Sequence, residues 1–329
     1  MKDQETSWLQ VFSALFLIIL LTLIAFQTEY FQGRDREFYT RIFSSINFTL
    51  DANLFLNFRY EPGFILLVDA FKLFIVDHEY IFLLICLASL FLKFFACIKS
   101  SVNPFFFFVS YFFVLFFTLE INQIRLGISL SIILFSVCFF PRNMQWRYTF
   151  YLIACLFQYS TILIVVSLFV IEKRPNKKIL LSIFSCLCLF IFTWGEVFYN
   201  QTRFSHYIAS QYVRLESDYH FINVQSIWLF FVGSLLFLYQ LGPISRTMPT
   251  GIRALFVLPA IGVIFYIFQS LGFPFLALRI FETFCFAIPF CLAWIFSYTK
   301  SELWKILLVI LTFGNAFYLI AMIPHRIVS

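Results

Sequence analysis

Long apolar blocks separated by polar turns dominate this chain, and the length of each block predicts the element that it forms. A helix needs about 20 consecutive apolar residues to cross the hydrocarbon of a bilayer. Nine blocks reach or approach this length and are predicted to span, at residues 8–26, 80–98, 104–119, 126–140, 179–198, 224–241, 253–271, 273–296 and 303–323. The pattern therefore predicts an all-α polytopic integral membrane protein.

Two further blocks are predicted to enter the membrane without crossing it. Residues 64–76 are apolar but short and contain two charges, which indicates an interfacial or re-entrant helix. Residues 148–171 are long enough to cross, yet basic turns at both ends conflict with the positive-inside preference. A helix that breaks near Gln158 and returns to the same side removes this conflict. A single polytopic domain over residues 1–329 would then hold about 9–11 transmembrane or re-entrant helices.

Two long polar segments interrupt the apolar blocks, at about residues 27–63 and 199–223. Connections of this length are usually functional. When the lysine-rich turns are placed on the cytoplasmic side, both segments fall on the opposite face, with Arg125 and the start of the span that holds Arg279. Neither segment contains lysine. Because arginine grips carboxylates and phosphates bidentately and lysine acts as a point charge, this face suits a phosphorylated substrate.

Composition supports the membrane class and removes several functions. Of the 329 residues, 62% are hydrophobic and 12% are charged, against about 25% charged in soluble domains. The net charge of +6 forms no basic tail, so we expect no nucleic acid partner. All eight cysteines lie in apolar blocks and the four histidines are scattered, so we expect no disulfide and no metal site. The sequence contains no HExxH, GxSxG, Walker or GxGxxG motif, which leaves no cofactor to expect.

Arg125 is the residue that the apolar pattern does not explain. It lies between the blocks 104–119 and 126–140. An always-charged side chain at membrane depth persists only where it faces a partner, a cavity or a ligand. Two plainer interpretations stay open, in which Arg125 snorkels to the interface or pairs with Glu120. The functional hypothesis requires other polar groups on the same face.

Carboxylates that lie among arginines supply such groups. Asp35 is flanked by arginines, Glu61 precedes a Pro-Gly pair, and Glu282 follows Arg279 by three residues. Each also has a plainer interpretation: Asp35 neutralises its neighbours, Glu61 is a turn residue, and the other two form an ion pair on a helix surface.

The order of these motifs resembles that of the Wzy/EpsG-like polymerases, which build O-antigen, capsule or exopolysaccharide. Those proteins carry a D-x-x-x-Y loop, an E-P/F-G-F start of a short helix, an R-x-x-[IL] span, an F-H-x-S break and a late A-R-[FIL]-x-x-[YF]-F span. The similar residues here are 35–39, 61–64, 122–127, 157–160 and 277–284, and the resemblance covers residues 30–290. Gln158 stands where that family has histidine, which favours hydrogen bonding over proton transfer, and Leu278 stands where alanine is common.

The resemblance implies a GT-C-like or Wzy-type architecture and a glycosyltransferase activity. Such an enzyme transfers a growing glycan from undecaprenyl pyrophosphate to the next lipid-linked repeat unit. It would lie in the bacterial inner (cytoplasmic) membrane, with its site on the periplasmic or outer face. The lipid-linked oligosaccharide and membrane lipid are then its partners, no cofactor is implied, and whether a chain-length regulator (co-polymerase) binds stays open.

In this scheme Arg125 and Arg279 stabilise the negative charge that develops on the pyrophosphate in the transition state. Glu61 is the first candidate for the general base and Asp35 the second. The other expected contacts to pyrophosphate and glycan come from Arg59, Tyr39, Gln123, Gln158, Arg203, His206, Arg214 and Glu282.

A transporter or flippase of lipid-linked oligosaccharide is the alternative function, because it also needs arginines that face a cavity. It predicts charges on both halves of the membrane and an inverted repeat, whereas the sequence shows a one-sided set of charges and no repeat. A glycosyltransferase with a single-sugar polyprenyl phosphate donor shares the polymerase chemistry and differs in donor size.

Overall fold

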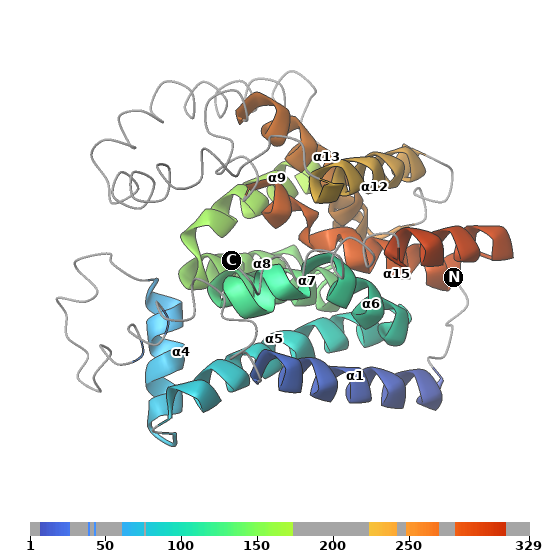
Figure 1. The fold of residues 1–329 in the computed structure, drawn as a ribbon. Helices are drawn as coiled ribbons and strands as arrows, with labels where there is room; N and C mark the ends of the chain where they lie inside the picture. Colours follow the sequence, from blue (N-terminus) through green and yellow to red (C-terminus); the bar gives the residue numbers. More distant parts are fainter. Residues whose placement is uncertain are drawn as a thin grey trace.

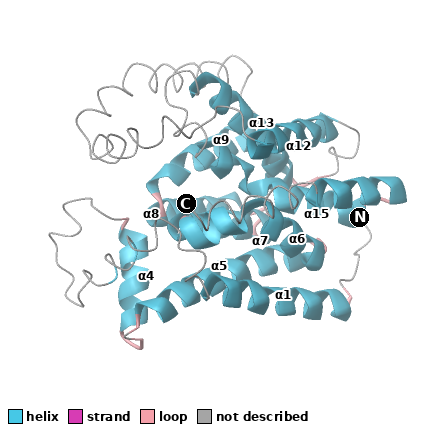
Figure 2. Cartoon of the chain, in the orientation of Figure 1, coloured by secondary structure: helices cyan, strands magenta, loops and turns pink. Residues whose placement is uncertain are grey.

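Helices joined by short turns make up the part of the chain that the computed structural model describes, and that part contains no strand (Figures 1 and 2). That part comprises residues 7–26, 39, 43, 61–75, 77–173, 224–241, 248–269 and 280–313. Within it, five helices are long and apolar enough to cross a membrane: Trp8–Phe26, His78–Lys99, Pro104–Asn122, Thr250–Ile267 and Ile280–Tyr298. These helices confirm the predicted all-α polytopic membrane protein.

The N-terminal half of the bundle follows the predicted spans closely. Helix α1 (Trp8–Phe26) packs against α5 (His78–Lys99) and α6 (Pro104–Tyr111), and α5 packs along α7 (Ile124–Phe139). Figure 1 shows α1 and α5 side by side along one edge of the bundle. Each of these helices satisfies its own backbone hydrogen bonds, which lipid cannot do, so helices are the stable form of these segments in a membrane.

Helix α6 ends at Tyr111, and the chain continues directly from it as a π-helix, Phe112–Asn122. Its last turn closes with a bond from the Gln123 backbone N–H to the Thr118 carbonyl at 3.0 Å, five residues back. The helical span therefore runs past residue 119, where the charge of Glu120 made the sequence predict its end. The structure extends it because that carboxylate is buried and paired inside the bundle.

Helix α4 (Pro62–Lys72) has 11 residues, which at 1.5 Å per residue is too short to cross the hydrocarbon. In Figure 1 it runs crosswise to α1 and α5. Pro62 occupies its first turn, where the missing backbone N–H costs nothing. This short helix agrees with the predicted interfacial or re-entrant element.

The interrupted block folds as two helices, α8 (Met144–Phe157) and α9 (Ile162–Lys173), joined by a 3₁₀ turn at Tyr159–Thr161. Arg147 in the first turns of α8 forms a buried ion pair with Glu172 in the last turn of α9, with 3.0 Å between Nη2 and Oε2. Tyr151 donates a second bond to that carboxylate, at 3.1 Å. The two outer ends of the hairpin therefore meet, which agrees with the predicted break and return.

The C-terminal half adds α12 (Val224–Leu241), α13 (Thr250–Gln269) and α15 (Ile288–Tyr298), and residues 302–313 are also helical. Helix α12 packs on α13, and α15 packs on α6. The predicted span at residues 179–198 lies outside the described residues. So do nearly all residues of the two long polar segments.

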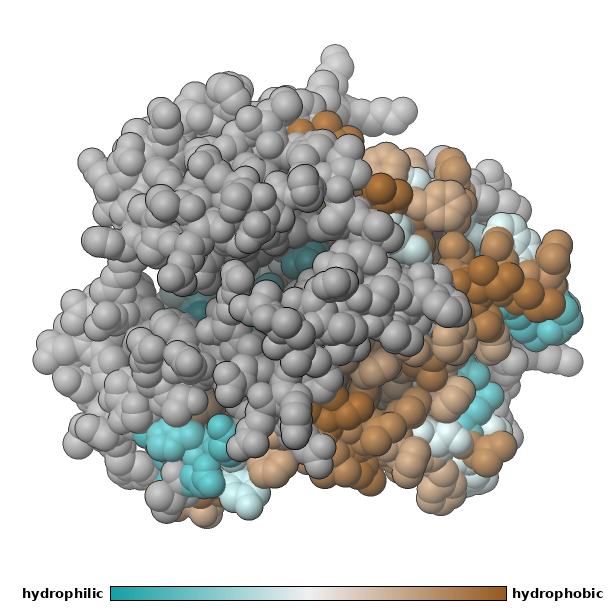
Figure 3. Space-filling model, viewed as in Figure 1, coloured by the Kyte–Doolittle hydropathy of each residue, from teal (hydrophilic) through white to brown (hydrophobic). Residues whose placement is uncertain are grey.

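Large apolar side chains cover the outside of the described bundle. On α1, Trp8, Phe12 and Phe16 are each at least 65% exposed. Figure 3 shows apolar side chains over the region of α1 at the lower right, with hydrophilic residues at the lower left, where α4 leads into α5. A surface of this kind is expected to face lipid, since large contiguous apolar patches are rare on proteins that are exposed to water.

Candidate functional site

Arg125 lies in the first turn of α7 and forms an ion pair with Glu61, the residue that precedes α4. Its Nη1 donates to Glu61 Oε2. The two side chains are 19% and 8% exposed. Because the guanidinium is mostly removed from solvent and faces a carboxylate from another element, simple snorkelling does not describe it. The structure thus brings together two of the predicted catalytic residues, which are 64 positions apart in the chain.

Aromatic rings line the other side of the Arg125 guanidinium. Its central carbon lies 5.7 Å from the centroid of the Tyr39 ring and 5.9 Å from that of Phe64. Tyr39 is buried and packs on the rings of Phe43, Phe64 and Phe82. Cations over aromatic faces gain electrostatic attraction. Tyr39, predicted as a substrate-binding residue, therefore lies beside Arg125 and helps to hold its side chain.

The place of Glu61 depends on a close approach between the start of α4 and the end of α8. A Cβ atom added at Gly63 would lie 2.9 Å from the backbone oxygen of Leu156. Only glycine permits this approach, because the neighbouring atom is backbone and cannot rotate away. Since Gly63 is two residues from Glu61, this contact fixes where the carboxylate leaves the helix start.

Replacing Gly63 by alanine is expected to push α4 away from α8 and to move Glu61 relative to Arg125. We expect a drop in turnover of about tenfold, because small misplacements of reacting groups reduce rate strongly. The sequence resemblance implies glycan transfer, and turnover of the purified variant in an assay of that activity measures this. Leu66→Ala on the same helix is the control, since Leu66 is 50% exposed. A Gly63→Ala enzyme with normal turnover would contradict this account of Glu61.

The break in the hairpin is held by α7, the helix that carries Arg125. Gln158 ends α8 with an extended backbone, and its side chain donates to Ser160 at 3.2 Å. Ser129, one turn beyond Arg125, donates to the Ala154 carbonyl at 2.7 Å, and its Oγ lies 2.8 Å from the hydroxyl of Thr161. The hairpin tip and the arginine are therefore fixed to the same helix.

Gln123 joins the π-helix to α7 through its backbone. Its φ of −124° and ψ of 53° turn the chain between the two helices, and its carbonyl accepts the Gly127 N–H at 2.9 Å. Glu282 lies half-buried in the helical residues that start at 280. The remaining predicted site residues lie outside the described residues: Asp35, Arg59, Arg203, His206, Arg214 and Arg279.

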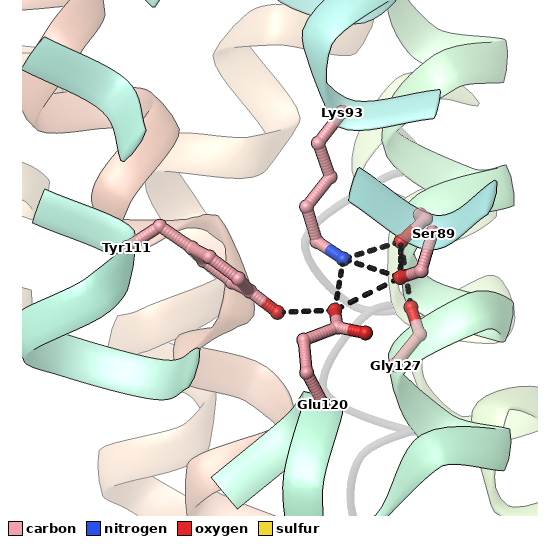
Figure 4. A network of polar contacts seen from close by, with 6 residues as sticks. Ser89, Lys93, Tyr111, Glu120 and Gly127 are labelled. Carbon is pink, nitrogen blue, oxygen red and sulfur yellow. Dashed lines mark hydrogen bonds and ion pairs between the residues drawn. The ribbon is translucent and has the colours of Figure 1, made fainter. Parts of the chain in front are cut away.

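The structure also contains a buried polar cluster that the pattern of the sequence did not predict (Figure 4). Lys93 Nζ lies 2.6 Å from Glu120 Oε1 and 2.7 Å from Ser89 Oγ, and it also contacts Ser131. Tyr111 donates to Glu120 Oε1 at 2.6 Å. Glu120 thus pairs with Lys93, so the sequence-based alternative that it pairs with Arg125 is wrong. Lys93 inside the predicted span 80–98 was the available signal, because intramembrane charges seldom occur without a partner.

Among the described residues, no group of three or more His, Cys, Asp and Glu side chains is placed to hold a metal ion. What the described site offers is an arginine, a carboxylate and aromatic rings. Such a site can bind an anion and accept a proton from a nearby hydroxyl.

Comparison with known protein families matches residues 12–328, nearly the whole chain, to the EpsG family. Neither the search of curated proteins nor the search of solved structures found a match. The family match agrees with the order of motifs noted in the sequence. The chain therefore belongs to the EpsG family.

Proposed function

We propose that this protein is a glycosyltransferase-type polymerase that joins oligosaccharide repeat units carried on undecaprenyl pyrophosphate. Its product would be O-antigen, capsular polysaccharide or exopolysaccharide. Membership of the EpsG family supports a role in polysaccharide polymerisation. The single structural observation that supports it most is the Arg125–Glu61 pair, because this pair joins an anion-binding group to a proton acceptor.

The proposed step is one displacement at an anomeric carbon. A hydroxyl of the non-reducing sugar on the next lipid-linked unit attacks the anomeric carbon of the growing glycan. The bond between that carbon and the pyrophosphate oxygen breaks, and its electrons leave on undecaprenyl pyrophosphate. The hydroxyl proton passes to the carboxylate of Glu61, with Asp35 as the second candidate. A new glycosidic bond and a free undecaprenyl pyrophosphate result.

In this step Arg125 stabilises the pyrophosphate leaving group. Negative charge grows on the pyrophosphate as the bond breaks, so a fixed guanidinium stabilises the transition state more than the ground state. A guanidinium has five N–H donors, so Arg125 can hold Glu61 and a phosphate oxygen together. Base and leaving group would then lie within one substrate head group of each other. Arg279 is proposed as a second arginine for the same charge.

The proposed location is the bacterial inner membrane, with the site on the periplasmic or outer face. Exposed apolar side chains on helices such as α1 support contact with lipid, and the lipid chain of the substrate would lie against such helices. The lysine-rich turns support the cytoplasmic assignment of the opposite side.

A polymerisation assay with purified protein in detergent tests this function. Lipid-linked repeat units from cells that lack the protein would be incubated with it, and products separated by size. A polymerase gives a ladder of joined repeats without any membrane to cross, whereas a flippase gives single units only. Heat-treated protein is the control. Single units alone, from a preparation that is folded and monodisperse, would contradict the proposal.

The donor is tested in the same assay. Units on pyrophosphate should be joined, while a single sugar on a polyprenyl monophosphate should not. Efficient transfer from the single-sugar donor would instead identify the protein as a membrane glycosyltransferase that uses a single-sugar polyprenyl phosphate donor.

A further inference from the structure

The buried cluster around Lys93 joins three helices and the π-helix. Ser89 and Lys93 come from α5, Tyr111 from the end of α6, Glu120 from the π-helix and Ser131 from α7. Lys93 and Glu120 are 3% and 0% exposed. The three N–H donors of the lysine therefore have three oxygen partners at 2.5–2.7 Å. In Figure 4, Lys93 reaches the Glu120 carboxylate from above and Tyr111 reaches it from the left.

The cluster depends on the π-helical register. Tyr111 and Glu120 are nine residues apart. A π-helix has roughly 4.4 residues per turn, so nine residues make about two turns and both side chains lie on one face. An α-helix has 3.6 residues per turn, and nine residues would then place the two side chains on opposite faces. The hydrogen bond between Tyr111 and Glu120 therefore forms in the π register and not in the α register.

That register also sets where α7 starts. Only Gln123 and Ile124 separate the π-helix from Arg125. A Cβ atom at Gly127 would lie 2.8 Å from the Leu119 carbonyl and 3.3 Å from both carboxylate oxygens of Glu120. The first turn of α7 thus packs directly on the last turn of the π-helix. Rotation of Glu120 would displace that turn, and Arg125 with it.

We propose that Lys93 is a positioning residue: by holding Glu120 together with Tyr111, it fixes the π register of residues 112–122 and thereby the place of Arg125. π-Helices are rare, occur mostly as single turns and are frequent at functional sites, so a π-helix of 11 residues needs an interaction that stabilises it. The effect on catalysis rests on the proposed function, whereas the claim about the helical register does not.

The catalytic part is tested with the double substitution Lys93→Met and Glu120→Gln. Removing both charges avoids a buried charge without a partner, which single substitutions would leave. We expect a folded protein whose KM stays within about twofold and whose kcat falls about tenfold, because Arg125 still binds but is misplaced in the transition state. A folded double variant with wild-type kcat would overturn the proposal.

The register is tested by hydrogen exchange, which needs no activity. Tyr111→Phe removes one hydroxyl and one hydrogen bond, and we expect faster amide exchange across residues 112–127 and a fall in kcat of about threefold. Tyr239→Phe is the matched control, since the Tyr239 hydroxyl is buried and has no hydrogen-bond partner among the described residues. It should leave both quantities unchanged. Exchange in Tyr111→Phe equal to that of the unmodified protein would overturn the proposal.

These measurements separate the two claims. If the unmodified protein joins no repeats, the proposed polymerase function fails, and the exchange rates of Tyr111→Phe and of the double variant still decide whether Tyr111 and Lys93 hold the register. If the double variant does not fold, Tyr111→Phe provides both kcat and exchange rate. In each case the comparison with Tyr239→Phe shows whether the change in kcat or exchange rate is specific to the Tyr111 hydroxyl.

Discussion

Replacing Arg125 by alanine is expected to abolish long polymer, while single lipid-linked repeat units persist. Among the described residues, Arg125 is the only arginine that forms an ion pair with a predicted catalytic carboxylate, that of Glu61. Its loss removes the fixed positive charge at the proposed leaving group, and loss of one such donor costs roughly a hundredfold or more in rate. It also leaves the nearly buried Glu61 without this charged partner. The measurement is the size ladder of glycan from cells or from the purified assay.

Arg125→Lys separates charge from geometry. Lysine keeps a positive charge but cannot hold a phosphate oxygen and a carboxylate through a planar fork. We expect it to restore little polymer. Arg142→Ala is the matched control, because Arg142 is exposed in the turn before α8 and should give a normal ladder. A normal ladder from Arg125→Ala would refute the role of this arginine.

Glu61→Gln is expected to slow polymerisation by about tenfold to a hundredfold. Glutamine has nearly the same shape and can still accept a hydrogen bond from Arg125, but it cannot accept the proton of the attacking hydroxyl. The effect should be smaller than for Arg125→Ala, since the pyrophosphate leaving group is already activated. Initial rates of repeat joining measure it, together with KM, which we expect to change little.

The control for this change is Glu302→Gln, because the Glu302 side chain is 77% exposed and forms a surface ion pair with Lys305, three residues along the same helix. It should leave the rate unchanged. Unchanged yield and modal length in Glu61→Gln would remove Glu61 as the base and leave Asp35 as the next candidate. In that outcome the Arg125–Glu61 pair would serve only to orient the guanidinium.

Most of the described helices follow from local sequence. The prediction for residues 8–26 matches α1 at both ends, and α12 matches the predicted 224–241. The break near Gln158 was predicted from its polar residues and from the charges around it. These predictions succeeded because a helix in lipid must be long, apolar and internally hydrogen-bonded, and each requirement is visible within one stretch of chain.

The π-helix and the charge pairs did not follow from local sequence. The run 104–119 is so rich in phenylalanine that no periodic pattern distinguishes a π register from an α register. Glu120 was considered as a partner for Arg125 because the two are close in sequence. The structure pairs it instead with Lys93, on another helix.

The sequence by itself determined that this is a multi-pass helical membrane protein with a short helix, a broken hairpin and an arginine that needs a partner. Those features depend on hydrophobicity and charge along a single segment. The tertiary structure decided which groups meet: Glu61 reaches Arg125 across 64 positions, and Lys93 reaches Glu120 across 27. Such pairings depend on how separate helices pack, since only packing brings distant charges within hydrogen-bonding distance and removes water from around them.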